Sequence, residues 1–183
     1  MNTATQKTSK IFLAAHREKR LSQGHLWIFS NEIERSENVQ DGELVEIYSH
    51  QNKFLGIGFY NSHSLIAARI LSVTRRNIDV SFFAERIRTA QILRANLYPK
   101  DSAYRLIFGE SDALPGLIVD RYDDTFVIQS YCLGMDKLTP LFVEALETCF
   151  TCKNIVLKND SSIRDLEQVP KEVRLLKGEG NFP

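Results

Sequence analysis

The hydrophobic pattern of this chain changes near residue 75. Before that point, short apolar runs separated by polar turns have the period of two that is typical of strands. After the polar segment Arg75, Arg76 and Asn77, apolar residues recur every three or four positions, which is the pattern of one helix face. These residues are Phe83, Ile87, Ala90, Leu93 and Leu97. A chain of 183 residues can bury two small cores, so we expect two domains, at residues 1–75 and 76–183.

The first part predicts a compact β-barrel of about five short strands. We expect strands at residues 10–15, 25–33, 43–49, 53–60 and 65–73, and a short helix that ends at Gly24 between the first two. Gly56 and Gly58 lie two positions apart in an apolar strand, which is typical of a small closed barrel with no room for side chains on one face. Trp27 follows the alternating apolar pattern of its segment, so we expect its indole in the core.

The second part predicts an α+β domain. Asp79 or Ser81 can cap a helix that Pro99 stops. Strands are then expected at residues 106–108, 117–119 and 125–129, followed by a helix at 135–150, a strand at 154–158 and a short polar helix capped by Ser161 or Ser162. No further element is expected after that helix. Helices and strands that follow one another in this order favour an α+β fold.

The charge of the chain is balanced overall but unevenly distributed. Lys plus Arg and Asp plus Glu both total 23, so the net charge of the chain gives no reason to expect a polyanionic partner. Residues 1–76 nevertheless hold ten basic side chains and seven acidic ones, and all four histidines lie there. The tilt in charge is modest, but polar contact chemistry is concentrated in the first part of the chain.

The sequence has no feature of a membrane or secreted protein. No apolar run approaches the roughly 18 residues needed to cross a bilayer, and the first ten residues have no apolar signal-peptide core. Three cysteines make no disulfide framework, which favours a reducing, cytoplasmic location. Cys149 and Cys152 form a CxxC motif, but no second Cys or His pair completes a zinc site, so we interpret them as structural.

Three separated segments of the chain resemble one family. They are AHREKRLSQGHLWIFSNEI, FLGIGFYNSHSLIAARIL and RLIFGESDALPGLIVDRYDD. The first 75 residues resemble a PUA domain, and the three segments together resemble the N-terminal part of the S-adenosylmethionine-dependent rRNA large-subunit methyltransferases of the cytosine-5 type. The resemblance covers residues from about 10 to 177. It implies a PUA-like pseudo-barrel, then an α+β domain that links it to a catalytic methyltransferase domain, which we expect to be absent from this truncated chain.

RNA binding requires cations near phosphates and planar or amide groups near exposed bases. Arg17, Lys19 and Arg20 supply three cations within four residues, although each could equally be a solvated surface residue. Arg69 could be either a buried ion-pair partner or an RNA contact. The expected RNA-binding residues are Lys10, Arg17, Lys19, Arg20, His25, Asn31, Asn61, Ser64 and Arg69.

A catalytic site is not expected in this chain. Binding of a methyl donor in this class of enzyme requires a Gly-rich loop between a strand and a helix. Gly56 and Gly58 lie within a strand, and Gly178 and Gly180 are followed by too few residues to form a helix. We therefore expect no catalytic residue, cofactor or metal here, with S-adenosylmethionine bound by full-length relatives only.

The segment Glu110, Ser111 and Asp112 is read as a loop rather than as a hydrolase site. A nucleophilic serine needs a base, and no histidine lies beyond His63. Ser111 and Asp112 are expected to hold the loop through bonds from side chain to backbone, with Arg121 as an ion-pair partner of the loop.

The sequence therefore predicts the substrate-recognition portion of an rRNA methyltransferase, which binds structured RNA such as large-subunit rRNA and contacts no membrane. The alternative is a free-standing interaction or dimerisation protein with a PUA-like fold. Its homodimer would form through the second domain. Phe82, Leu133 and unpaired strand edges are the candidate contact points, although they could equally be covered internally.

Overall fold

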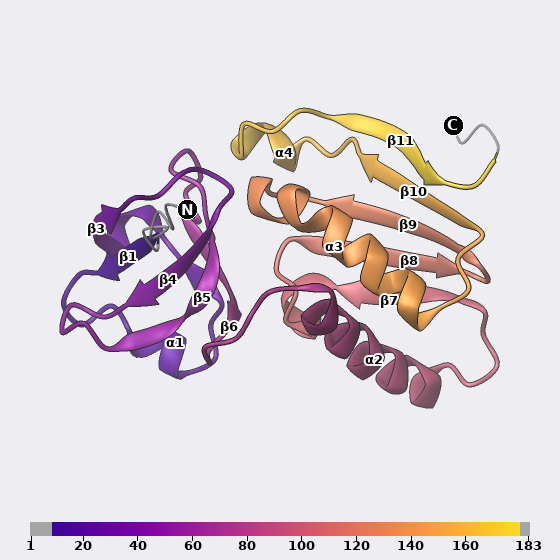
Figure 1. The fold of residues 1–183 in the computed structure, drawn as a ribbon, viewed down its shortest axis with the longest axis horizontal. Helices are drawn as coiled ribbons and strands as arrows, with labels where there is room; N and C mark the ends of the chain where they lie inside the picture. Colours follow the sequence, from indigo (N-terminus) through magenta and orange to yellow (C-terminus); the bar gives the residue numbers. More distant parts are fainter. Residues whose placement is uncertain (1–8, 180–183) are drawn as a thin grey trace, which may run out of the picture. The chain divides into compact units, whose positions relative to one another are not determined.

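The computed structural model describes residues 9–179, which form two compact units (Figure 1). Unit 1 comprises Met1–Arg76 and unit 2 comprises Asn77–Pro183. Each unit has its own sheet and its own core. No helix among the described residues is long and apolar enough to cross a membrane.

Unit 1 is built on a six-stranded sheet with the strand order β2-β6-β5-β4-β1-β3. Its strands are β1 (Lys10–Leu13), β2 (Trp27–Ile28), β3 (Ile33–Glu37), β4 (Leu44–Tyr48), β5 (Phe54–Tyr60) and β6 (Ala68–Ser72). A short helix, α1 (Lys19–Ser22), and a 3-10 turn, Ser30–Glu32, join the first three strands. β1 and β4 pair in parallel, and the other neighbours are antiparallel. β3 was not expected from the sequence, because this mostly exposed edge strand has no apolar alternation.

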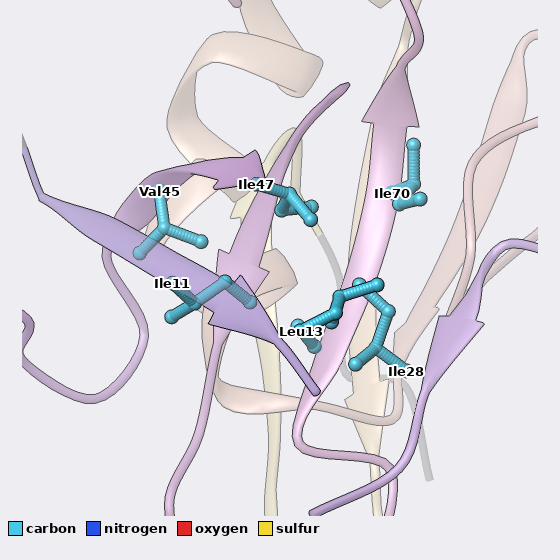
Figure 2. Close-up of a cluster of buried hydrophobic side chains, with 7 residues drawn as sticks. Ile11, Leu13, Ile28, Val45, Ile47 and Ile70 are labelled. Atoms are coloured by element: carbon cyan, nitrogen blue, oxygen red, sulfur yellow. The ribbon is translucent and has the colours of Figure 1, made fainter. Parts of the chain in front are cut away.

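The core of unit 1 collects alternate residues of its strands on one face of the sheet (Figure 2). Its members are Ile11, Leu13, Ile28, Val45, Ile47, Ala68 and Ile70. Ile28 is 1% exposed, whereas Trp27 beside it is 37% exposed. Since neighbouring side chains of a strand point to opposite faces, the burial of Ile28 turns Trp27 outward. The expectation that Trp27 lies in the core was therefore wrong.

Gly56 and Gly58 allow the sheet to curl. A Cβ atom on Gly58 would lie 2.1 Å from the carbonyl oxygen of Arg69, and one on Gly56 would lie 2.7 Å from that of Ser72. Both oxygens belong to β6, so this strand approaches β5 at a distance that excludes any side chain on that face. The sheet thus forms a curled half-barrel.

Unit 2 has a five-stranded sheet with the order β11-β10-β9-β8-β7. Its strands are β7 (Ala103–Phe108), β8 (Leu117–Tyr122), β9 (Thr125–Ser130), β10 (Asn154–Asn159) and β11 (Glu172–Lys177). The helices are α2 (Val80–Leu97), α3 (Leu133–Cys149) and α4 (Ile163–Leu166). α3 connects the parallel pair β9 and β10, and α2 and α3 lie side by side on one face of the sheet (Figure 1). The expectation of no element after the last short helix was wrong, because β11 completes the sheet there.

The cap of α2 is as expected, since Asp79 accepts a hydrogen bond of 3.0 Å from the backbone amide of Phe82. The apolar face expected for this helix is only partly buried. Leu93 and Leu97 are exposed, and Arg94 is buried in their place because it pairs with Asp112. Phe82 is fully buried, so its side chain cannot form the contact surface of a dimer.

Candidate nucleic-acid interface

The connection between β1 and β2 presents two cations to solvent, Arg17 before α1 and Lys19 as the first residue of α1. His16 has a left-handed backbone (φ 66°), and the amide of Arg17 donates to the carbonyl oxygen of Ala14 at 3.2 Å, which turns the chain into α1. Arg17 and Lys19 are both exposed. Gly24 then adopts φ +89° and the chain returns to the sheet as β2. Local backbone geometry therefore holds the two cations on one short connection beside an edge of the sheet.

Arg20 has a different environment from its two neighbours. Its Nη2 donates to the carbonyl oxygen of Trp27 at 3.3 Å, and its guanidinium lies 4.8 Å from the ring centre of Phe29. Its Nη1 is 3.9 Å from Oε1 of Glu32, a buried carboxylate whose Oε2 accepts from the amide of Phe29 at 2.8 Å. Arg20 therefore links α1 to β2 and to the following 3-10 turn. We assign it a positioning role.

Three of the expected RNA contacts lie in the interior of unit 1. Asn61 is buried and its Oδ1 accepts from the amide of His63 at 3.1 Å, while the amide of Ser64, also buried, donates to the carbonyl oxygen of Asn61. Arg69 is buried on β6 and its Nη1 donates to the carbonyl oxygen of Ile66 at 3.4 Å. These side chains shape the loop between β5 and β6. The structure thus does not bring them together with Arg17 and Lys19 on one exposed surface.

His25, Asn31 and Trp27 are exposed on or beside β2. Trp27 pairs with Arg69 across the β2–β6 ladder, and the amide of Ser30 donates to the carbonyl oxygen of Leu65 at 3.0 Å. The exposed position of Trp27 was not expected from the sequence. The signal that could have identified it is the equally apolar Ile28 beside it, since only one of two neighbours in a strand can face the core.

Lys10 lies at the opposite end of β1, within a second cationic array on the outer face of the sheet. Its Nζ is 5.6 Å from the ring centre of Tyr48. Tyr48 stacks on Phe12 with a centroid distance of 5.3 Å and meets Phe54 edge-on at 5.9 Å. Arg35 lies 3.4 Å above Phe12, and Arg75 lies 4.2 Å above Phe54. This array is not evident from the sequence, because its members come from segments that are distant along the chain.

The charges of this array are largely matched within it. Arg75 donates to the hydroxyl of Tyr48 at 2.8 Å and to Oε1 of Glu46 at 3.3 Å. The hydrogen bond with Tyr48 is the main cause that raises the pKa of Arg75; desolvation opposes this rise in part, and the charge of Glu46 adds to it. Arg35 pairs with Glu37. Because these guanidinium groups already have acidic partners, the array stabilises the outer face of the sheet more than it attracts a polyanion.

Unit 2 contains buried ion pairs but, among residues 9–179, no cluster of His, Cys, Asp or Glu that could hold a metal ion. Arg164 is fully buried and its Nη2 is 2.7 Å from Oδ2 of Asp136. Asp112 accepts from the amide of Phe108 at 2.6 Å, as expected for a residue that holds its loop. Its ion-pair partner is Arg94; Arg121 instead donates to the hydroxyl of Tyr104 at 2.7 Å.

A PUA-like domain matches residues 11–73 of the chain. The chain is 38% identical to ribosomal RNA large subunit methyltransferase I of Vibrio cholerae over 94% of its own length and 44% of that protein. It is 39% identical to the Aliivibrio fischeri protein of the same name, with the same shares covered. The chain thus spans less than half the length of these relatives.

Solved structures support the fold. A proposed SAM-dependent methyltransferase from Streptococcus mutans superposes with a TM-score of 0.77 at 20% identity, over 94% of this chain and 44% of that chain. A second methyltransferase structure, complexed with SAH, has the same TM-score and identity. The chain therefore contains a PUA-like domain and is similar over nearly its whole length to the ribosomal RNA large subunit methyltransferases I, of which it spans 44%.

Proposed function

We propose that unit 1 binds structured RNA and is the substrate-recognition portion of an rRNA methyltransferase. This proposal rests on two exposed cations, Arg17 and Lys19, which lie on the connection between β1 and β2 of a PUA-like domain. Cations on a short, defined connection can meet successive phosphates of a folded RNA. The similarity to proteins named as rRNA methyltransferases supports large-subunit rRNA as the partner.

The proposed RNA-binding surface consists of Arg17, Lys19, His25, Trp27 and Asn31, with Arg20 as its positioning residue. Asn61, Ser64 and Arg69 support the same region from the interior. We assign no methyl-donor site to these residues. Gly56 and Gly58 accommodate the carbonyl oxygens of β6, so they do not form a phosphate-type loop at a helix start. S-adenosylmethionine would be bound by parts of full-length relatives that this chain does not match.

The test is a fluorescence anisotropy titration of a labelled large-subunit rRNA fragment at about 50 mM and about 200 mM salt. We expect affinity to fall steeply with salt. The double variant R17A/K19A should bind more weakly and lower the slope of log K against log salt by about one to two. The matched control K100A/K153A removes two exposed lysines of unit 2 and should leave the slope unchanged. Binding that is insensitive to salt, or equal effects of both double variants, would contradict the proposal.

A second candidate function is self-association through unit 2, at a different surface from the one expected from sequence. Leu93, Leu97, Tyr98 and Phe108 are exposed apolar side chains that line one groove between the end of α2 and β7. Exposed apolar patches of this kind often mark contacts between proteins. Sedimentation equilibrium of the wild type and of L93E/L97E would test it, since a dimer should dissociate in the variant. A monomer at all concentrations in the wild type would exclude this function.

A further inference from the structure

Trp27 is held in an exposed position by its surroundings. It belongs to a two-residue strand at the edge of the six-stranded sheet. Ile28 anchors this strand in the core, and the amide of Ile70 donates to the carbonyl oxygen of Leu26 at 2.8 Å on the other side of Trp27. The carbonyl oxygen of Trp27 itself accepts from Arg20. The backbone at Trp27 is thus fixed from both sides, and the indole remains partly exposed at a defined place.

One cation contacts the backbone of Trp27, and two more lie on the connection that leads to β2. The guanidinium of Arg20 contacts the backbone of Trp27 directly, and Arg17 and Lys19 precede it on the same connection. The nearby carboxylate of Glu32 is buried and engaged with the amide of Phe29, so it does not present its charge freely to a ligand. A partly exposed aromatic side chain on a fixed backbone, which follows exposed cations on the same connection, suits a ligand that is both planar and anionic. A nucleotide unit of single-stranded RNA has these properties, with its base on the ring and its phosphate near the cations.

We propose that Trp27 stacks on an unpaired RNA base, so that the target of unit 1 contains a loop, bulge or single-stranded nucleotide at this position. The inference rests on the proposed RNA-binding function and adds the class of RNA that it recognises. Bases inside a duplex are stacked on one another and cannot lie on the indole. The chain should therefore prefer a stem-loop over a continuous duplex of the same length and charge.

The protein provides a direct probe, because its sequence contains a single tryptophan. Indole emission therefore reports on position 27 alone. An RNA stem-loop should quench this emission with the same midpoint as its anisotropy change. A fully paired duplex of equal nucleotide number should bind with little quenching.

Variants at this position give an independent measurement. Trp27→Ala should weaken binding of the stem-loop about tenfold or more and binding of the duplex far less, whereas Trp27→Phe should retain part of the preference. The control Val73→Ala changes another exposed apolar residue of unit 1 and should bind both RNAs as the wild type does. Circular dichroism of each variant checks that unit 1 remains folded.

The outcomes separate this inference from the function on which it rests. Salt-dependent binding of the stem-loop without quenching, or equal affinity of Trp27→Ala and wild type, would overturn the role of Trp27 and leave RNA binding intact. Absence of binding to either RNA would overturn both. If Trp27→Ala does not fold, quenching of the wild type and the preference of Trp27→Phe still decide the question.

Discussion

Arg94 and Asp112 form a bidentate ion pair that also occupies the outer edge of β7. Nη1 and Nη2 of Arg94 lie 2.8 Å and 2.6 Å from the two carboxylate oxygens of Asp112. Nε of Arg94 donates to the carbonyl oxygen of Arg105 at 3.1 Å, and Asp112 accepts from the amide of Phe108. Free backbone groups on an edge strand can pair with another chain, so these contacts protect β7 from such pairing at this point.

We expect Asp112→Ala to destabilise unit 2 by about 3–5 kcal/mol, because it leaves the charge of Arg94 buried without its carboxylate partner. Asp165→Ala is the matched control, since its pair with Lys171 is exposed and should contribute less than about 1 kcal/mol. Urea unfolding followed by circular dichroism measures both. Similar losses in the two variants would contradict the structural role of the Arg94 pair.

Gly58→Ala should destabilise unit 1 by about 3 kcal/mol or more, because the added methyl group would meet the backbone of β6 rather than a movable side chain. Gly24→Ala is the comparison. A Cβ atom there meets nothing within 4 Å, and only the left-handed backbone opposes it, at a cost of about 1 kcal/mol. In thermal and urea unfolding, Gly58→Ala should therefore be much less stable than Gly24→Ala. The reverse order would show that β6 can move away from β5.

Glu32 stabilises unit 1 through its hydrogen bond with Phe29, and it also lies beside Arg20 of the proposed RNA-binding surface. Glu32→Ala removes the acceptor for the amide of Phe29 and should reduce the stability of unit 1 by about 1–3 kcal/mol. Glu32→Gln keeps an acceptor oxygen and should cost less. It also removes the charge beside Arg20, so its RNA affinity should equal or exceed that of the wild type. Unfolding and anisotropy titrations of both variants check these outcomes, and a larger loss in Glu32→Gln would count against them.

Cys152 should be nearly unreactive in the folded protein. Burial raises the pKa of its thiol to about 11, with Lys177 partly opposing the shift and Glu147 adding to it. Since the thiolate is the reactive form, iodoacetamide at pH 8.5 should modify Cys149, which is half-buried, before Cys152. Mass spectrometry of timed samples measures this order. Equal rates in the folded protein would contradict it.

The same raised pKa predicts a pH dependence of stability. An ordinary thiol ionises near pH 9.0, so between this value and about pH 11 the folded state keeps a proton that the unfolded state has lost. The contribution of Cys152 to the free energy of unfolding is therefore complete below pH 9 and decreases as the pH rises to 11. Comparison of wild type with Cys152→Ala across this range isolates the effect. A difference between the two that does not change with pH would refute it.

Several elements could be predicted from the sequence because their signals are local. The cap at Asp79 and the turn at Gly24 each depend on the chemistry of a few neighbouring residues. Gly58 indicated a position without room for a side chain, but the strand that approaches it, β6, is identified only in the folded protein. β3 and β11 could not be predicted in this way. Both are edge strands with few buried side chains, so their pairing partners, rather than their own pattern, make them strands.

The candidate site, too, could be predicted only in part from the sequence. The sequence identified the segment that contains Arg17, Lys19 and Arg20, but it does not distinguish the roles of three cations that lie within four residues. Their roles separate only in the folded protein, because the distance of Arg20 from Glu32 and Phe29 depends on how α1 packs beside β2. Burial of Asn61 and Ser64 likewise depends on the loop that they form.

The sequence by itself determined the two periodicities, the two units that follow from them and the resemblance to a family, since all three are properties of residue order. The tertiary structure decided which face of each strand is buried. At β2 the burial of Ile28 in the core leaves Trp27 on the opposite, exposed face. It also decided that Asp112 pairs with Arg94, which lies 18 positions away along the chain. Such outcomes depend on which distant surfaces pack together, because burial and charge pairing are properties of the assembled core and not of any local segment.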